Sequence, residues 1–231
     1  MQEKNVTEIL SELVKIKSIS SDKNHIADVK KSAEFVEKLF LELGLQTKIA
    51  TSGNSRPAVL AQTEINPDRK TVLLYAHHDV QPVGDINKWE TDPFNPEIIN
   101  GRLFGRGSGD NKAGVVIHHE VVKELMKDLP VNIKIFIEGE EEIGSPCMAQ
   151  FLDEFNKELE ADVIVIADSG NIRIGTPTVT TSLRGLVDGF IEVDQPMRPV
   201  HSGVGGGVVP DAFMVLSKII ASFHNEKGEL Q

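Results

Sequence analysis

Residues that can bind metal or transfer protons follow three apolar segments of this sequence and begin one helical segment. Segment 71–76 runs into His77-His78-Asp79, segment 131–137 runs into Glu138-Gly139-Glu140-Glu141-Glu142, segment 163–167 runs into Asp168, and Gly109-Asp110-Asn111-Lys112 opens a helical pattern. In open α/β sheets the carboxyl ends of the strands meet at one rim, where ligands bind. Several acidic side chains in one cleft need a positive partner. A pair of divalent metal ions is the simplest partner.

The first candidates also have ordinary structural interpretations. His77 could make a plain hydrogen bond at a strand end, or it could bind metal while Asp79 accepts its second N–H and fixes the tautomer. Asp110 could be the N-cap of the helix that follows. The glycines at 105, 107 and 109 let the backbone approach a ligand closely, which favours a bridging role for Asp110.

The remaining polar candidates are weaker. Asp168 could simply cap the turn that follows it. Acidic runs are usually solvated faces, but the run at 140–142 follows a buried strand, which favours the rim of the sheet. His118 and His119 lack the spacing of a zincin motif and are interpreted as a solvated helix face. Cys147 has no histidine partner in the sequence and is interpreted as an inert thiol.

The hydrophobic periodicity predicts the elements that position these residues. Helices are expected over 6–16, 26–43, 113–126, 148–159 and 210–223, and strands over 46–50, 58–62, 71–75, 131–137, 163–167, 178–182 and 186–193. The proline- and glycine-rich segment 80–109 is expected to be a long irregular loop. Strands that alternate with helices indicate an α/β fold with a mixed, mostly parallel sheet flanked by helices.

Composition excludes several classes of protein. The 231 residues carry a net charge of -11 with both signs dispersed, whereas nucleic-acid binding requires a basic face. The N-terminus lacks the features of a signal peptide, and no apolar run approaches the length of a membrane span. The single cysteine excludes an internal disulfide and fits a reducing compartment. We therefore expect a cytoplasmic protein that binds neither nucleic acid nor membrane.

Taken together, four ordered motifs resemble the M20 family of dinuclear zinc peptidases, and in particular its carnosinase-like dipeptidase branch. The motifs are residues 77–82, 105–112, 138–145 and 167–168. The resemblance implies two Zn²⁺ ions, with Mn²⁺ or Co²⁺ as alternatives. It implies that His77 and Asp168 hold one ion, that Glu142 holds the other, and that Asp110 bridges them. It also implies that Asp79 orients His77, that Glu141 is the general base, and that the peptide bond Asp110–Asn111 is cis.

The same resemblance implies two domains, a metal-dependent catalytic domain over residues 1–182 and the beginning of an α+β lid over 183–231. In the lid, His201 is expected to reach across a homodimer to the substrate carbonyl, although it could instead only brace a glycine-rich turn. Family members continue beyond this length and supply a late histidine for the second metal. His224 is a poor substitute, so we interpret the chain as C-terminally truncated.

These observations predict a hydrolase that cleaves the amide bond of dipeptides or similar small substrates through a metal-bridging water. Glu141 would accept the proton of that water and pass it to the leaving amine. An N-acyl amino-acid deacylase or desuccinylase of the same family is the rival within this chemistry. A truncated, inactive remnant that only binds metal or dimerises is the rival from another class.

Overall fold

The computed structural model describes residues 5–194, 198 and 200–231. The chain divides into two compact units, one up to Thr178 and one from Val179 on. The candidate metal ligands all fall in the first unit.

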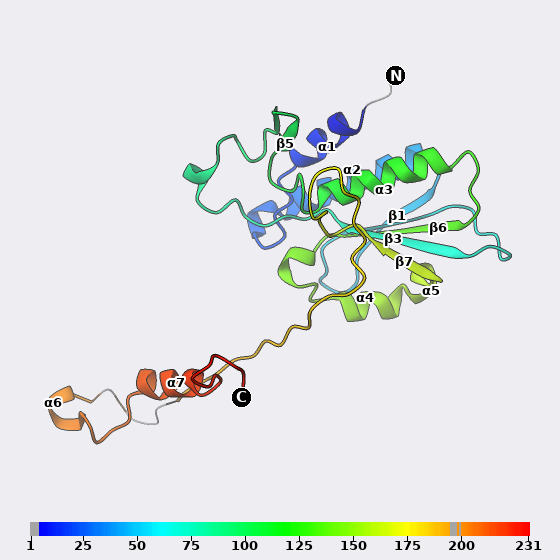
Figure 1. The fold of residues 1–231 in the computed structure, drawn as a ribbon. Helices are drawn as coiled ribbons and strands as arrows, with labels where there is room; N and C mark the ends of the chain where they lie inside the picture. The colour runs from blue at the N-terminus through cyan, green and yellow to red at the C-terminus, as the bar shows by residue number, and fades with distance from the viewer. Residues whose placement is uncertain (1–4, 195–197, 199) are drawn as a thin grey trace. The chain divides into compact units, whose positions relative to one another are not determined.

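A five-stranded sheet forms the centre of the first unit (Figure 1). Its strands, in spatial order, are β1 (Gln46–Ala50), β2 (Ala58–Gln62), β6 (Asn132–Glu138), β3 (Thr71–His77) and β7 (Val163–Ile166). The pairs β1–β2 and β2–β6 are antiparallel, whereas β6–β3 and β3–β7 are parallel. Only β2 therefore runs against the other four strands, which confirms the predicted mixed, mostly parallel sheet.

Helices cover both faces of this sheet (Figure 1). The helices α1 (Val6–Val14), α2 (Ile26–Glu42) and α3 (Lys112–Leu125) lie on one face, and α4 (Met148–Glu154) and α5 (Asn156–Leu159) lie on the other. Because side chains alternate along a strand, neighbouring residues enter different cores. Leu74 and Ile137 pack with α1–α3, while Leu73 and Phe136 pack with Phe151 of α4.

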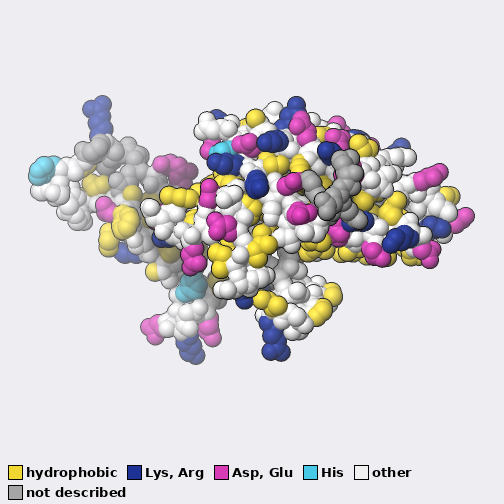
Figure 2. Space-filling view, turned by 90° about the horizontal axis from the view of Figure 1, so that it is seen from above, with side chains coloured by type: hydrophobic (Ala, Val, Ile, Leu, Met, Phe, Trp, Pro, Cys, Tyr) yellow, Lys and Arg dark blue, Asp and Glu magenta, His cyan; other side chains and the backbone are white. Residues whose placement is uncertain are grey.

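Local sequence explains where the helices begin. Asn5 caps α1 through a reciprocal pair of hydrogen bonds with Glu8, which is a capping box. Asn111 caps α3 by accepting from the backbone N–H of Gly114. Figure 2 views the first unit from the side of α1–α3, where acidic and basic side chains are interspersed.

Two expectations for the elements of the first unit were wrong. Segment 80–109 is not wholly irregular, because β4 (Glu97–Ile99) and β5 (Arg102–Phe104) pair as a hairpin and a 3₁₀ turn spans Ile86–Lys88. The turn residues Asn100 and Gly101 have φ values of 51° and 76°, as an Asn-Gly hairpin turn requires. The helix expected over 148–159 is divided into α4 and α5. Further 3₁₀ turns occupy Lys23–His25 and Glu141–Ile143.

The interpretation of His118 and His119 as a solvated face was also wrong. Their exposed fractions are 3% and 6%. Both lie on the same stripe of α3 as Val115 and Val122, because residues three and four apart share a helix face. His118 Nε2 donates to the carbonyl oxygen of Tyr75, and the ring of His119 packs edge-on against Phe40.

In the second unit, the strands expected at 178–182 and 186–193 do not form. Val187 and Phe190 are fully or almost fully exposed, and these segments have no neighbouring strand to pair with among the described residues. The strand propensity of these two segments was not sufficient to form strands without a partner. The helices described here are α6 (Ser202–Gly205) and α7 (Ala212–Ala221), the latter within the predicted helix 210–223. Among the described residues, no helix has the length and apolar character needed to cross a membrane.

Candidate metal centre

The three parallel strands β6, β3 and β7 deliver the candidate residues to one rim of the sheet. His77, the last residue of β3, lies opposite Glu138, the last residue of β6. On the other side of β3, the backbone N–H of Ala167 donates to the carbonyl oxygen of Tyr75, which places Asp168 just beyond β7 at the same rim. The strand ends thus meet as the sequence predicted.

The imidazole of His77 is the centre of this cluster. It is fully buried, and its Nε2 lies 3.1 Å from Asp110 Oδ1, 3.7 Å from Glu141 Oε2 and 3.8 Å from Asp168 Oδ2. One potential ligand atom each from His77, Asp110 and Asp168 lies within 4.8 Å of the others. Three carboxylates from separate parts of the sequence therefore converge on one nitrogen of a buried imidazole.

Asp79 lies behind His77, on the side away from these acids. Its carboxylate is fully buried, with Oδ1 3.3 Å from His77 Nδ1. The backbone N–H groups of Glu141 and Glu142 donate to its two oxygens at 3.2 and 3.1 Å. Asp79 thus connects the end of β3 to the turn that follows β6.

The successive glutamates of the acidic turn after β6 differ in burial and in the direction of their side chains. Glu140 is 5% exposed, and its two oxygens accept from the backbone N–H groups of Arg56 and Cys147, both at 2.9 Å. The side chain of Glu141 is 38% exposed and extends toward His77. Glu140 therefore has a structural role, whereas the carboxylate of Glu141 is accessible to a small molecule.

The charges at this rim are mutually unfavourable. Burial, together with neighbouring carboxylates, raises the pKa of Glu141, Glu142 and Asp168 above their ordinary values. Burial disfavours the charged form of His77, but the hydrogen bond and charge of Asp79, with those of Asp168 and Glu141, outweigh it and raise the pKa of His77 to about 9. The rim therefore retains protons, as expected of a site with strong negative potential.

A divalent cation fits this arrangement. It would replace the retained protons with positive charge and leave His77 neutral, which is the form that binds metal. An imidazole nitrogen combined with carboxylate oxygens is a donor set that suits zinc and related ions. The Asp110–Asn111 peptide bond is cis, as the resemblance implied.

Glu142 and His201, two further expected site residues, also lie outside the three-residue cluster. Glu142 lies beside it, with its backbone carbonyl accepting from Gln81 Nε2 at 2.7 Å. His201 belongs to the second unit, where its Nδ1 accepts from the backbone N–H of Gly203 at 3.1 Å and caps α6.

Sequence reasoning did not identify several buried polar residues around the rim. Lys112 is fully buried, and Tyr75 donates a 2.6 Å hydrogen bond to Glu138, which is 3% exposed. Burial raises the pKa of both Tyr75 and Glu138. The position of Lys112 directly after Asp110-Asn111 was a signal that could have been used.

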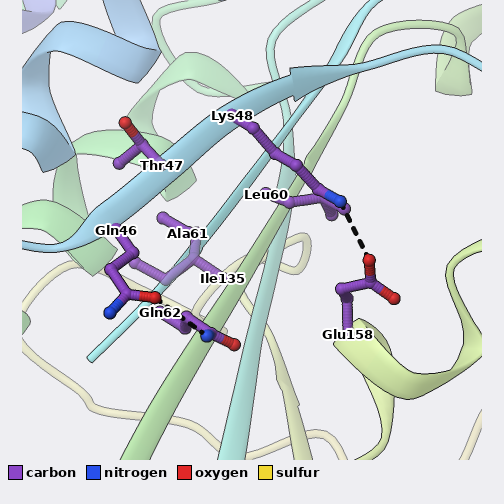
Figure 3. A pocket seen from close by; sticks show the side chains of 8 residues that line it. All are labelled: Gln46, Thr47, Lys48, Leu60, Ala61, Gln62, Ile135 and Glu158. Carbon is purple, nitrogen blue, oxygen red and sulfur yellow. Dashed lines mark hydrogen bonds and ion pairs between the residues drawn. The ribbon is translucent and has the colours of Figure 1, made fainter. Parts of the chain in front are cut away.

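A pocket elsewhere on the sheet offers a contrast (Figure 3). It is lined by side chains from β1, β2, β6 and α5, namely Gln46, Thr47, Lys48, Leu60, Ala61, Gln62, Ile135 and Glu158. Lys48 pairs with Glu158 at 2.9 Å, and Gln62 donates to Gln46 at 3.3 Å. Its polar groups already satisfy one another, so it lacks the unneutralised charge of the rim.

Comparison with known proteins agrees with the chemistry of the rim. Residues 73–225 match the model of peptidase family M20/M25/M40. A cysteinylglycine-S-conjugate dipeptidase of Corynebacterium striatum is 36% identical over 222 residues, which cover 95% of this chain and 49% of that protein. The human Beta-Ala-His dipeptidase is 34% identical over 179 residues, which cover 75% of this chain and 35% of that protein.

Solved structures give the same relationship. Human carnosine dipeptidase 1 superposes with a TM-score of 0.72 at 27% identity, covering 97% of this chain and 50% of that one. An M20 family metallo-carboxypeptidase from Sulfolobus solfataricus gives 0.79 at 27% identity, covering 99% and 52%. The chain spans about half the length of the first curated relatives it matches. The family match and the fold together establish that this chain belongs to peptidase family M20/M25/M40.

Proposed function

We propose that this chain carries the metal centre of a dipeptidase that hydrolyses the amide bond of small peptides. The supporting observation is the convergence of His77, Asp110 and Asp168, with Glu141 3.7 Å from the same imidazole. The curated relatives named above are dipeptidases, so a deacylase or desuccinylase is not favoured.

In this proposal the centre would take two Zn²⁺ ions. His77 and Asp168 would hold one ion, Glu142 would hold the other, and Asp110 would be shared by both. Asp110 suits a bridge because its side chain is 72% exposed and adjacent to His77. Bound zinc would polarise the substrate carbonyl and make the attacking water more acidic.

The residues of the chain itself perform the proton transfers. The Nδ1–H of His77 donates to the backbone carbonyl oxygen of Asp79 at 3.1 Å, with the Asp79 carboxylate 3.3 Å from the same nitrogen, which keeps Nε2 free to act as a ligand. Glu141 accepts a proton from the attacking water and returns it to the leaving amine. Burial and the neighbouring carboxylates raise the pKa of Glu141, so it takes up and keeps this proton more readily than an ordinary glutamate.

The proposal also includes the domain organisation of the whole protein. Residues 1–182 would be the catalytic domain and 183–231 the beginning of a lid, through which the full protein forms a homodimer. His201 would contact the substrate carbonyl from that lid. A cytoplasmic location rests on the single cysteine.

Metal counting combined with a substrate comparison tests this proposal. The 231-residue chain is loaded with Zn²⁺, its metal content is measured by mass spectrometry, and hydrolysis of Cys-Gly and β-Ala-His is compared with that of N-acetyl and N-succinyl amino acids. Two bound ions and faster hydrolysis of the dipeptides would support the dipeptidase.

Each other outcome has a definite meaning. Preferential hydrolysis of the acylated amino acids would replace the dipeptidase with a deacylase. Bound metal without turnover would support an inactive metal-binding remnant, and no bound metal would reject the centre itself.

A further inference from the structure

The end of α1 and the segment that follows it contact both loops that carry the metal-site residues. Residues 13–20, which include the last two residues of α1, are called the brace. Ser18 and Ser20 of the brace are fully buried. The brace contributes no residue to the cluster formed by His77, Asp110 and Asp168.

On one side the brace holds the loop at the end of β3. Ser18 Oγ donates to the carbonyl oxygen of His78 at 2.7 Å, and the backbone N–H of Val80 donates to the carbonyl oxygen of Ser18 at 2.9 Å. Ile19 and Val80 form a parallel β-bridge. These contacts fix the backbone on both sides of Asp79.

On the other side the brace holds the loop that carries Asp110. The Nζ of Lys112 donates to the carbonyl oxygens of Leu13 and Ile16 at 2.9 and 2.6 Å. The backbone N–H of Lys112 donates to the carbonyl oxygen of Gly107 at 3.0 Å. A Cβ at Gly107 would lie 3.1 Å from the Lys112 side chain, so the lysine stem runs directly over this glycine.

Backbone anchoring matters for Asp110 because its side chain is 72% exposed. Side-chain packing therefore contributes little to its position, although its Oδ1 lies 3.1 Å from the imidazole of His77, 33 residues away in sequence. Metal sites tolerate errors of only about 0.2 Å in ligand distances. The two loops consequently need a common anchor.

We propose that the brace, through Ser18 and Lys112, is a positioning element that sets the separation of the His77 and Asp110 loops and thereby the metal affinity of the site. This inference depends on the proposed metal centre. It assigns Lys112 and Ser18 a role beyond fold stability, although neither touches the metal or the substrate.

The chain offers matched controls for Lys112 and for Ser18. Lys134 is 8% exposed, and its Nζ donates to the carbonyl oxygens of Lys157 and Glu160 around the end of α5, at 2.9 and 2.7 Å. It repeats the bonding of Lys112 near the opposite end of the strands. Likewise Thr63 is a buried hydroxyl residue, bonded to the backbone of Ile133.

The test compares Lys112→Met with Lys134→Met, and Ser18→Ala with Thr63→Val. Zn²⁺ affinity of the 231-residue chain is measured by competition with a chromophoric chelator, and the visible absorption spectrum of the Co²⁺-loaded chain reports ligand geometry. We expect Lys112→Met to weaken Zn²⁺ binding by about 10- to 100-fold, the range for residues that support metal ligands. Ser18→Ala should weaken it by a smaller factor, and both variants should alter the Co²⁺ spectrum.

The control variants should have lower melting temperatures but wild-type metal affinity and Co²⁺ spectra. Wild-type affinity in Lys112→Met and Ser18→Ala would overturn the inference. If Lys112→Met does not fold, Ser18→Ala decides alone. Equal loss of affinity in the controls would also overturn it, because the effect would then be one of general stability.

Failure of the brace and failure of the proposed function are distinguishable. Zn²⁺ binding without peptide hydrolysis contradicts the dipeptidase activity only. No Zn²⁺ binding by the unmodified chain contradicts the metal centre and the brace together.

Discussion

The two ends of the central sheet use buried polar residues in opposite ways. At the end away from the metal centre, the side chain of Asn132, which is 2% exposed, accepts from the backbone N–H of Asn66 and donates to the carbonyl oxygens of Asn66 and Arg69. At the rim, His77 faces three carboxylates, at least two of which have raised pKa values. The buried polar groups at the Asn132 end are paired by hydrogen bonds, whereas the carboxylates at the rim repel one another.

This contrast separates stability from function within one set of strands. The same two strands, β3 and β6, reach both ends of the sheet. Strand propensity therefore does not explain why the polar groups are paired at one end and repel one another at the other. Perturbed pKa values combined with a specific charge partner are typical of functional sites. The predictions below test whether substitutions at each end affect only the property assigned to that end.

The largest effect is expected from Glu141→Gln. This change removes the carboxylate that accepts the proton but retains the size and polarity of the side chain. A positioned general base contributes typically about 10²- to 10⁴-fold, so kcat for dipeptide hydrolysis should fall by about that factor. Steady-state kinetics and metal counting of the Zn²⁺-loaded chain provide the measurement.

Metal content should remain that of the wild type in this variant. Glu140→Gln serves as the comparison, because Glu140 is bonded to the backbone of Arg56 and Cys147 and should affect stability instead. Retained turnover in Glu141→Gln would show that the base is misassigned.

The next largest effect is expected for Asp168→Asn, in which the variant loses a charged ligand. Its Zn²⁺ affinity should fall by more than the about 10- to 100-fold typical of residues that only support a ligand. The metal-free protein should become more stable, since burial and the neighbouring acids raise the pKa of Asp168 and disfavour its charged form. Chelator competition and urea unfolding measure the two effects.

The opposite end provides the control for this second effect. Asp162 accepts hydrogen bonds from Lys70 and from the backbone N–H of Thr71, which lower its pKa. Asp162→Asn should therefore destabilise the protein and leave Zn²⁺ affinity unchanged. An increase in stability for Asp162→Asn, or a decrease for metal-free Asp168→Asn, would contradict the proposed difference between the two ends.

A third prediction concerns stability at the opposite end. Asn132→Ala removes the hydrogen bonds of this buried side chain to the backbone of Asn66 and Arg69. A hydrogen bond contributes about 0.5–1.5 kcal/mol net, so the loss of these bonds should lower the free energy of unfolding by about 1–3 kcal/mol. Urea denaturation measures it, and a simultaneous change in Zn²⁺ affinity would show that the two ends are coupled.

The sequence predicted those features that depend on local pattern. Two short strand patterns separated by the turn-rich segment 51–55 placed β1 and β2 at the observed bounds, and the residues after β3, β6 and β7 predicted the rim. These features depend on a few neighbouring residues and on the rule that ligand sites form at strand ends.

Features that depend on contacts between distant residues were not predictable in the same way. Lys112 bonds to Leu13 across 99 residues, and no local pattern identifies that partner. His118 and His119 were misjudged because polarity was given more weight than their helical stripe. The hairpin β4–β5 was missed although Asn100-Gly101 is a strong turn signal.

The smallest expected effect is a change in pH dependence at His118. Burial lowers the pKa of His118 below its ordinary value of 6.5. The unfolded chain therefore takes up a proton more readily than the folded one as pH falls below about 6.5, and stability falls with it. For this single residue the loss between about pH 7 and about pH 5.5 is at most about 1.3 kcal/mol. Urea unfolding of the metal-free chain at both pH values measures it.

His118→Gln should remove this contribution while a side-chain N–H remains available to the carbonyl oxygen of Tyr75. Acids at the rim act with the opposite sign, because a raised pKa makes the folded state gain protons first on acidification. Only the difference in slope between the wild type and the variant isolates His118, and His224→Gln, at an exposed position, should leave the slope unchanged. An equal dependence of the unfolding free energy on pH in the wild type and His118→Gln would show that burial of this imidazole does not destabilise the protein in acid. The difference between stabilising and destabilising polar groups would then be limited to the two ends of the strands.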